Sequence, residues 1–324
     1  MEKILEKWTG EVAEVIIGAT VSEGGSRDFS VKVGGGRSLP GWNSENGKFA
    51  KPIVVAEVMD FLPIDLWPLF YSEYKEVVTD MTKWIKEVEK APIDGLCVRL
   101  NSSVIETKED YLKYVDEIVG KVLSSTRLPL IFLGSGDIEV DKKVLPLICK
   151  LTKGEKILVG MVEKENYREI VSSIIENGHS LITQSPLDIN LAKQLNILVN
   201  DMGVPLNRIV MHHTTAGLGY GLEYCYSIME RCRLSALQGD RVLSSPMINL
   251  VSEETWKIRE SKVGIDEEPT WGEPLPRSIN WELTTAIAYF YAGSDILVLL
   301  HFLSSCHTTL VLMLFFRVKG HNDQ

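Results

Sequence analysis

Short apolar runs alternate along the chain with longer segments that carry apolar residues at helical spacing. Eight of the runs are almost continuously apolar and rich in β-branched residues, which is typical of parallel strands covered on both faces. The predicted strands are residues 52–58, 95–100, 128–133, 157–161, 180–184, 208–211, 247–251 and 295–299. The predicted helices are residues 74–90, 108–123, 142–151, 166–175, 186–200, 222–237, 253–260 and 279–291.

This alternation predicts an α/β fold, and eight strand–helix units predict a (β/α)8 TIM barrel. A doubly wound open sheet is the alternative that the same alternation allows. Two further β-type runs, residues 11–17 and 29–33, are joined through glycines and predict a β-hairpin ahead of the barrel. We therefore expect an N-terminal hairpin extension in residues 1–36 and the barrel in residues 37–324.

The composition is that of an ordinary soluble globular protein, with 45% hydrophobic and 24% charged residues among 324. A formal net charge of −10 argues against nucleic acid or an anionic membrane as a partner, because both reward clustered Lys and Arg. The five cysteines form no C-x-x-C pair, so local spacing provides neither a zinc site nor an iron–sulfur cluster. Free thiols and an N-terminus without signal-peptide character predict a cytoplasmic protein.

The stretch from Arg208 to Gly221 carries the clearest candidate site. It reads Arg-Ile-Val-Met-His-His-Thr-Thr-Ala-Gly-Leu-Gly-Tyr-Gly and predicts a buried strand, a polar glycine loop and then the helix 222–237. Hydroxyl and backbone N–H groups therefore lie at the carboxyl end of a strand, which is where α/β proteins bind ligands.

Two more specific readings of this stretch are disfavoured. His212 and His213 are adjacent on a strand and point to opposite faces, which argues against one metal site built from both. Gly217 and Gly219 do not open a dinucleotide fingerprint, because Leu222 stands where the third glycine of G-x-G-x-x-G would be. The glycines instead favour a close approach of the backbone to a ligand or partner.

A barrel brings the residues that follow its strands together on one face. These residues are rich in amides and hydroxyls and contain no nucleophile paired with a base, which favours many hydrogen bonds to a large ligand with carboxamide edges. The polar character that any barrel shows at this face is the alternative explanation. The residues are Asp60, Arg99, Asn101, Ser135, Asp137, Glu163, Asn166, Gln184, Ser185, Asp188, Asn190, His212, His213, Thr214, Thr215 and Asn249.

Several uncommon motifs, in order along residues 8–298, resemble those of one family. They include Gly18-Ala-Thr20, Gly136-Asp137, Glu165-Asn166-Tyr167, Ser185-Pro-Leu-Asp-Ile-Asn190, Gly217-Leu-Gly-Tyr-Gly-Leu-Glu-Tyr224, Leu237-Gln-Gly-Asp240 and Trp271-Gly272. On these motifs the chain resembles the small (delta- or beta-type) subunit of the corrinoid iron–sulfur protein of the CO dehydrogenase/acetyl-CoA synthase pathway.

The resemblance implies a methyl-carrier subunit rather than a catalyst on its own. It implies a heterodimer in which a corrinoid (cobamide) lies between this barrel and a large subunit that holds the iron–sulfur cluster, so that no cluster, metal ligand or catalytic residue is expected in this chain. A methyltetrahydrofolate methyltransferase and acetyl-CoA synthase are implied as transient partners that supply and accept the methyl group. The residues implied for corrinoid binding are Asn101, Asp137, Asn166, Ser185, Asp188, Asn190, Thr214, Thr215, Gly217, Gly219 and Tyr220.

Two other functions fit the same residues. A pterin-binding methyltransferase barrel would handle methyltetrahydrofolate directly, with Asp137, Asn166 and Asp188 holding the pterin ring by paired hydrogen bonds. A purely structural barrel would only support the large subunit. Methyltetrahydrofolate binding by the isolated chain would favour the first, and unchanged corrinoid retention after loss of the threonine and glycine loop would favour the second.

Two departures from the family pattern concern His212-His213, where the family has Asp-Pro, and the end of the chain. After Leu299 the family continues with His-Pro and an amphipathic helix, whereas residues 296–316 here are uncharged and about long enough to span a bilayer. A membrane anchor is one alternative. We favour an altered end of the sequence whose final helix packs atypically and lowers solubility or stability.

Overall fold

The computed structural model describes residues 7–40, 48–101, 105 and 107–322. Its strands form a two-stranded antiparallel hairpin and an eight-stranded parallel sheet. The hairpin consists of β1 (Val15–Ile17) and β2 (Val31–Val33), both shorter than predicted. The large sheet consists of β3 (Ile53–Met59), β4 (Gly95–Arg99), β5 (Leu130–Leu133), β6 (Leu158–Val162), β7 (Ser180–Gln184), β8 (Ile209–His212), β9 (Ile248–Leu250) and β10 (Ile296–Leu299).

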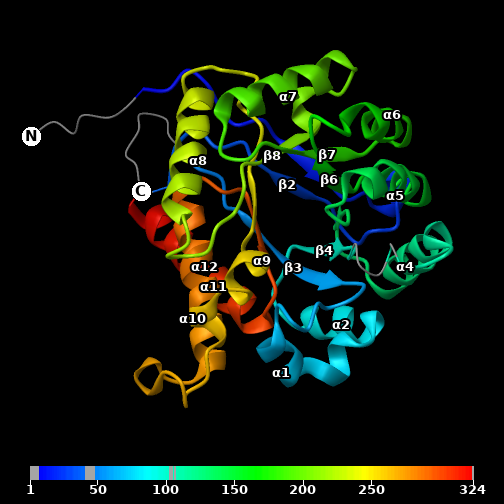
Figure 1. Ribbon diagram of the computed structural model, residues 1–324. Helices are drawn as coiled ribbons and strands as arrows, with labels where there is room; N and C mark the ends of the chain where they lie inside the picture. The colour runs from blue at the N-terminus through cyan, green and yellow to red at the C-terminus, as the bar shows by residue number, and fades with distance from the viewer. Residues whose placement is uncertain (1–6, 41–47, 102–104, 106, 323–324) are drawn as a thin grey trace, which may run out of the picture.

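Helices lie around the outside of the large sheet (Figure 1). They are α1 (Pro68–Val78), α2 (Met81–Val88), α4 (Tyr111–Ser125), α5 (Ile138–Leu151), α6 (Tyr167–Asn177), α7 (Ile189–Asp201), α8 (Leu222–Leu237), α9 (Val251–Trp256), α10 (Arg259–Lys262), α11 (Pro274–Ala292) and α12 (Phe302–Asn322). Short 3-10 segments occur at η1 (Val21–Glu23), η2 (Leu206–Arg208) and η3 (Pro269–Trp271).

The large sheet closes on itself. Its strand order is β8-β7-β6-β5-β4-β3-β10-β9, and every neighbouring pair is parallel. The two edge strands meet where Met211 forms a parallel bridge with Met247 and its N–H donates to Pro246 O at 2.8 Å. Eight parallel strands closed in this way, with helices outside, form a (β/α)8 barrel, so the predicted fold is confirmed and the open sheet is wrong.

The hairpin covers the end of the barrel at which the strands begin. Val15 and Ile17 of β1 belong to the same buried cluster as the inward-facing residues of the barrel strands. Backbone N–H groups of Ala13 and Gly18 donate to Ser244 O and Lys156 O, which precede β9 and β6. Because this end is filled by the chain itself, the opposite end carries the loops that are free to build a site.

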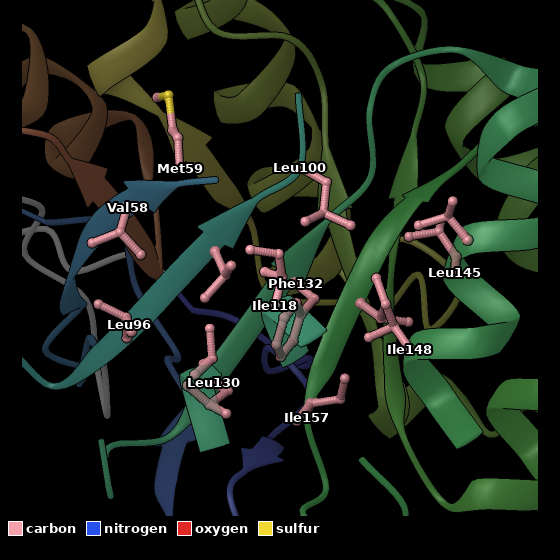
Figure 2. Close-up of a cluster of buried hydrophobic side chains, with 14 of the residues drawn as sticks. Val58, Met59, Leu96, Leu100, Ile118, Leu130, Phe132, Leu145, Ile148 and Ile157 are labelled. Atoms are coloured by element: carbon pink, nitrogen blue, oxygen red, sulfur yellow. The ribbon is translucent and has the colours of Figure 1, made fainter. Parts of the chain in front are cut away.

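The outer faces of the strands pack against the helices through the largest buried cluster. Figure 2 shows this cluster, which includes Leu96 and Phe132 of the sheet, Ile118 of α4, and Leu145 and Ile148 of α5. These side chains are at most 5% exposed, and burying one such side chain contributes about 1.5–3 kcal/mol. This layer holds the strand ends, and thus the loops beyond them, in fixed positions.

Two predicted helices are each divided in the structure. Residues 253–260 span the end of α9 and the start of α10, with a break at 257–258. Residues 74–90 form parts of two helices, because α1 ends at Val78 and α2 starts at Met81. Asp80 lies between them, and its carboxylate accepts hydrogen bonds from Thr82 N and Lys83 N as the N-cap of α2. An N-cap residue takes a non-helical conformation, so the apolar periodicity continues across a break that it does not reveal.

The end of the chain forms the last strand and then α12. The helix turns its hydroxyl side chains inward, and those of Ser304, Ser305, Thr308 and Thr309 are buried. Its outer face is apolar and exposes Leu303, Leu310, Val311, Met313 and Leu314. Within the ranges that the structure describes, no helix is both long and apolar enough to cross a membrane.

Candidate functional site

A polar pocket opens at the end of the barrel where the strands finish, and we call it the mouth pocket. Its volume is about 250 Å³, and its walls come from the ends of β4 to β9 and the segments that follow them. This is the face at which (β/α)8 barrels bind ligands. The lining residues are Arg99, Leu133, Gly134, Gly136, Ile138, Asp141, Met161, Glu163, Asn166, Gln184, His212, Thr214, Thr215, Leu250, Glu253 and Glu254.

A larger hollow, of about 1150 Å³, lies among residues near the opposite end of the barrel. Its walls include Trp8, Arg37, Asn207 and Arg241. None of the residues predicted to bind a ligand lines it. In (β/α)8 barrels that end contributes to stability rather than to binding, so we place the candidate site at the mouth pocket.

A chain of hydrogen bonds runs along one wall of the mouth pocket. Gln184 Nε2 donates to Glu163 Oε1 at 3.1 Å, so its Oε1 is left to accept from His212 Nδ1, also at 3.1 Å. His212 Nε2 then accepts from the Thr215 hydroxyl at 3.2 Å. Thr215 Oγ1 in turn accepts from Leu250 N at 2.9 Å, which links β6, β7, β8 and β9.

His212 is a neutral imidazole in this arrangement. Burial, together with the smaller effects of the neighbouring His213 and Arg99, lowers its pKa to about 3. The neutral ring supplies one donor and one acceptor, which matches its two partners, Gln184 and Thr215. The ring therefore holds the wall of the pocket and is not available as a proton donor near neutral pH.

An ionic layer lies beneath the opposite wall. Arg99 Nε donates to Glu57 Oε1 at 2.6 Å, and Arg99 Nη2 lies 3.0 Å from Glu253 Oε2. The second oxygen of Glu57 accepts from the Ser252 hydroxyl. Burial opposes the charge of Arg99, but the carboxylates of Glu57 and Glu253 outweigh it and raise the pKa of the guanidinium.

The mouth pocket is rich in hydrogen-bond acceptors. Burial raises the pKa of Asp141, Glu163 and Glu254, and Arg99 is the only cationic residue among those that line the described pocket. The Asp141 carboxylate folds back beneath the β5 loop and accepts from Ser135 N at 2.7 Å. Such a surface suits a ligand with many N–H donors, and carboxamides provide them.

Gly134 is needed where the β5 loop passes over Asp141. A Cβ at position 134 would lie 2.5 Å from the carboxylate of Asp141, a distance that no side chain tolerates. Asp141 is 4% exposed and its oxygens accept from Ser135 and Gly136 as well. The glycine thus allows the backbone of the loop to close over a buried acid at the edge of the pocket.

Three of the residues predicted to bind corrinoid line the mouth pocket, namely Asn166, Thr214 and Thr215. The amide of Asn166 is used within its own loop, since Oδ1 accepts from Glu163 N at 2.7 Å and Nδ2 donates to Met161 O at 3.3 Å. Thr214 has a φ of +82°, a conformation that β-branched residues rarely adopt. Its hydroxyl makes no hydrogen bond with the part of the chain that the structure describes.

Four other predicted residues lie around the mouth but serve local structure. Asp137 and Asp188 are the N-caps of α5 and α7, with carboxylates that accept from backbone N–H groups of the first turn. Ser185 Oγ lies 3.2 Å from Nδ1 of the buried His213, on the outer side of the sheet. The N–H of Asn101 donates to Asp60 Oδ1 at 2.8 Å.

The remaining predicted residues lie outside the mouth pocket. Asn190 lines a surface hollow along α7, next to Lys193. Gly217 packs against the backbone of Glu254, and a Cβ there would lie 3.1 Å from Glu254 O. Gly219 has a φ of +84°, and Tyr220 is exposed, with its hydroxyl bonded to Glu260.

The prediction that His212 and His213 point to opposite faces is confirmed. His212 faces the pocket and His213 is buried on the other side of the strand. The structure brings together no group of three or more His, Cys, Asp or Glu side chains in metal-binding geometry, as far as the described residues go. His212 therefore forms part of the pocket wall, and His213 lies outside the pocket.

Sequence reasoning missed Glu57, Asp141, Glu253 and Glu254. Glu57 had a signal, because it is the one charged residue in the apolar run Ile-Val-Val-Ala-Glu-Val-Met of β3. A lone acid inside a buried strand needs a partner, and Arg99 at the end of the next strand provides it. The other three lie on helices, beyond the strand ends that were considered.

Solved structures with a similar backbone agree with the barrel. Dihydropteroate synthase of Xanthomonas albilineans with 4-aminobenzoic acid matches 83% of this chain and 93% of its own, with a TM-score of 0.56 and 12% identity. The enzyme of Stenotrophomonas maltophilia with bound imidazole matches 84% and 95%, with a TM-score of 0.55 and 11% identity. At these identities the likeness concerns the fold alone.

Sequence comparison is more specific. The acetyl-CoA decarbonylase/synthase complex subunit delta 1 of Methanosarcina thermophila is 34% identical over 308 residues, which cover 92% of this chain and 69% of the relative. The delta subunit of Methanopyrus kandleri is 33% identical over 294 residues, 90% of this chain and 72% of the relative. The family model for the CO dehydrogenase/acetyl-CoA synthase delta subunit matches residues 14–314. The chain belongs to this delta-subunit family, which confirms the resemblance seen in its motifs.

Proposed function

We propose that the chain is the corrinoid-binding methyl-carrier subunit of an acetyl-CoA decarbonylase/synthase complex. The names of its relatives place them in such a complex, and the sequence motifs resemble the small subunit of a corrinoid iron–sulfur protein. In this proposal a large subunit with the iron–sulfur cluster covers the other face of the corrinoid. A methyltetrahydrofolate methyltransferase and acetyl-CoA synthase then meet the pair in turn.

The size and character of the mouth pocket carry the proposal. With about 250 Å³ it is below the range of pockets that enclose a drug-sized ligand, and a corrin macrocycle is larger still. Its lining nevertheless includes carboxylates, backbone groups and the hydroxyl of Thr214, which makes no hydrogen bond within the described residues. A surface of this kind suits contact with one face of a flat, carboxamide-bearing ligand whose other face is held by a second protein.

The side chains that would hold the corrinoid are those that reach the open side of the pocket. Thr214 offers its hydroxyl, and Glu163 and Glu254 offer acceptors for carboxamide N–H groups. Phe61 and Leu187 lie on the loops after β3 and β7, Tyr224 lies in the first turn of α8, and all three are large and exposed. These apolar residues would exclude water from the edge of a bound macrocycle and contact the partner subunit.

A bound corrinoid supplies a cobalt centre that accepts and donates a methyl group, and the protein contributes position and shielding. The neutral His212 and the paired Arg99 keep the pocket wall fixed without placing a mobile proton near the ligand. The apolar rim limits access of water to the reactive face. None of these residues has to react, which agrees with a carrier rather than a catalyst.

The test is co-production of the chain with its large subunit, followed by cobalt analysis and visible spectroscopy of the purified complex. We expect about one corrinoid per complex and a clear loss in a variant with Thr214→Val and Glu254→Gln. Thr79→Val changes an exposed threonine at the end of α1 and serves as the control. A complex that forms without cobalt or corrinoid absorption would rule the proposal out.

The structure does not favour the pterin-binding alternative, because the three residues predicted to hold the pterin have other roles. Asp137 and Asp188 are helix caps, and the amide of Asn166 is bonded within its own loop, so the three do not converge on one ring. The volume of the mouth pocket is the observation that still favours a bicyclic ligand. Binding of methyltetrahydrofolate to the isolated chain, measured by calorimetry, would support this alternative over the carrier.

The purely structural alternative predicts a different outcome for the same complex. If the barrel only supports its partner, replacing Thr214, Thr215 and Gly219 together will leave corrinoid retention unchanged. If the loop contacts the corrinoid, the same replacement will release it while the two subunits stay associated. Size-exclusion chromatography with absorbance at two wavelengths separates these results.

A further inference from the structure

We propose that Tyr289 is a positioning residue for corrinoid retention, because it fixes the loop that presents Thr214 and Thr215 to the mouth pocket. The inference rests on the proposed function and adds a residue that lies outside the pocket, on α11. Tyr289 was not among the residues predicted from the sequence, and it contacts the loop rather than any ligand.

One hydroxyl holds both backbone groups of a single loop residue. Tyr289 Oη accepts from Ala216 N at 2.8 Å and donates to Ala216 O at 2.8 Å. The Tyr289 side chain is fully buried, and burial raises the pKa of the phenol, so the group stays a neutral donor at any working pH. Ala216 directly follows Thr214 and Thr215, which line the pocket.

Two more residues on the same face of α11 hold the next part of the loop. Thr285, one turn before Tyr289, accepts from Leu218 N through Oγ1 at 3.4 Å. Trp281, one turn earlier again, donates from Nε1 to Leu218 O at 3.1 Å. The spacing of four residues places all three side chains in a row along α11. The helix therefore forms hydrogen bonds to the loop backbone at Ala216 and Leu218.

These hydrogen bonds from α11 help to keep the loop in a strained conformation. The loop has to hold Thr214 at a φ of +82°, which is strained for threonine and persists only when surrounding contacts enforce it. Thr215 is fixed on one side by His212 and Leu250. Tyr289 fixes the other side, at Ala216, and so completes the restraint on the two threonines.

The experiment uses the complete complex with its large subunit and compares wild type, Tyr289→Phe and Tyr291→Phe. The Phe variant keeps the ring and removes both hydrogen bonds to Ala216, whereas Tyr291 packs against Phe290 and Phe315 away from the loop. We expect Tyr289→Phe to weaken corrinoid retention about tenfold, because the N–H and C=O groups of Ala216 both lose their buried partner, and to speed amide exchange at Ala216 and Leu218. Tyr291→Phe should change neither.

The two readouts separate the possible results. Faster exchange with unchanged retention would make Tyr289 a structural residue and overturn the inference, as would no change in either. A wild-type complex without corrinoid would instead overturn the proposed function, and the inference with it. If Tyr289→Phe does not fold, Thr285→Val should show a smaller loss of retention that Thr285→Ser restores, and equal retention in both would overturn the inference.

Discussion

Arg99 Nε donates to Glu57 Oε1 at 2.6 Å inside the barrel, between the ends of adjacent strands. Glu57 is completely buried, while the side chain of Arg99 is 18% exposed toward the mouth pocket. Below this pair the interior of the barrel is apolar, and above it lies the polar pocket. The pair is therefore the layer at which the barrel changes from core to candidate site.

Replacing one member of this pair should lower the free energy of unfolding far more than replacing both. Arg99→Met leaves the Glu57 carboxylate buried without its partner, and we expect a loss of about 3 kcal/mol in the free energy of unfolding. The double variant Glu57→Leu/Arg99→Met should recover much of that loss. Denaturant unfolding measures both, and Lys90→Met, which breaks an exposed pair with Glu87, should cost only about 0.5 kcal/mol. Equal losses in the single and double variants would contradict the role given to the pair.

Replacing Thr214 by glycine should make the protein more stable but weaken its retention of the corrinoid. Glycine has no penalty at a φ of +82°, so Thr214→Gly should raise the free energy of unfolding by about 1 kcal/mol. The same change removes the hydroxyl and should lower corrinoid retention in the complex. Thr214→Ala is the matched control, because it loses the hydroxyl but keeps a Cβ in the strained conformation. It should lower retention without the gain in stability, and a stabilised Ala variant would count against strain as the cause.

Glu282 should make stability depend on pH. The carboxyl is fully buried on α11, where it accepts from Leu300 N at 2.6 Å, and burial raises its pKa to about 7 from an ordinary value of 4.5. Between these values the folded chain holds a proton that the unfolded chain has lost. The contribution of Glu282 to stability is therefore greatest below pH 4.5 and falls as the pH rises to 7.

The comparison with Glu282→Gln isolates this effect, since glutamine stays neutral and the histidines contribute equally to both proteins. Raising the pH from 4.5 to 8 should shift the stability difference toward the variant by about 3 kcal/mol, because the pKa of Glu282 is about 7 in the folded protein and 4.5 in the unfolded chain. Urea unfolding at several pH values gives the difference directly. A difference that does not change with pH would mean that Glu282 ionises in the folded protein as it does in water.

The fold could be predicted because its signals are local. The helix predicted at 222–237 is α8 (Leu222–Leu237), since Gly221 and Gly239 mark its two ends and its apolar spacing is continuous. The eight apolar runs all became barrel strands. The break at Asp80 could not be predicted from periodicity, because a cap changes the backbone and leaves the spacing of the apolar residues intact.

The sequence predicted where the candidate site lies but not which of its side chains are available to a ligand. The sequence placed polar residues after each strand, and the barrel brought Asn166, Thr214 and Thr215 to one pocket. It could not tell which polar groups are already used, and Asp137 and Asp188 turned out to cap helices. It also gave no weight to Tyr289, whose hydrogen bonds to Ala216 join segments far apart in the chain. Such pairings depend on how the elements pack, which a single sequence does not specify.

The outer face of α12 should cause self-association, which refines the expectation that the end of the chain lowers solubility. Leu310 and Leu314 are 55% and 52% exposed on an apolar stripe, while Leu312 between them is buried. Leu310→Glu/Leu314→Glu should therefore reduce association in analytical ultracentrifugation without lowering the melting temperature. Leu312→Glu places the same charge on the inner face and should instead destabilise the fold by several kcal/mol, because it buries an unpaired carboxylate. If the double variant also unfolds, the outer face of α12 packs against the protein and the exposed stripe does not exist.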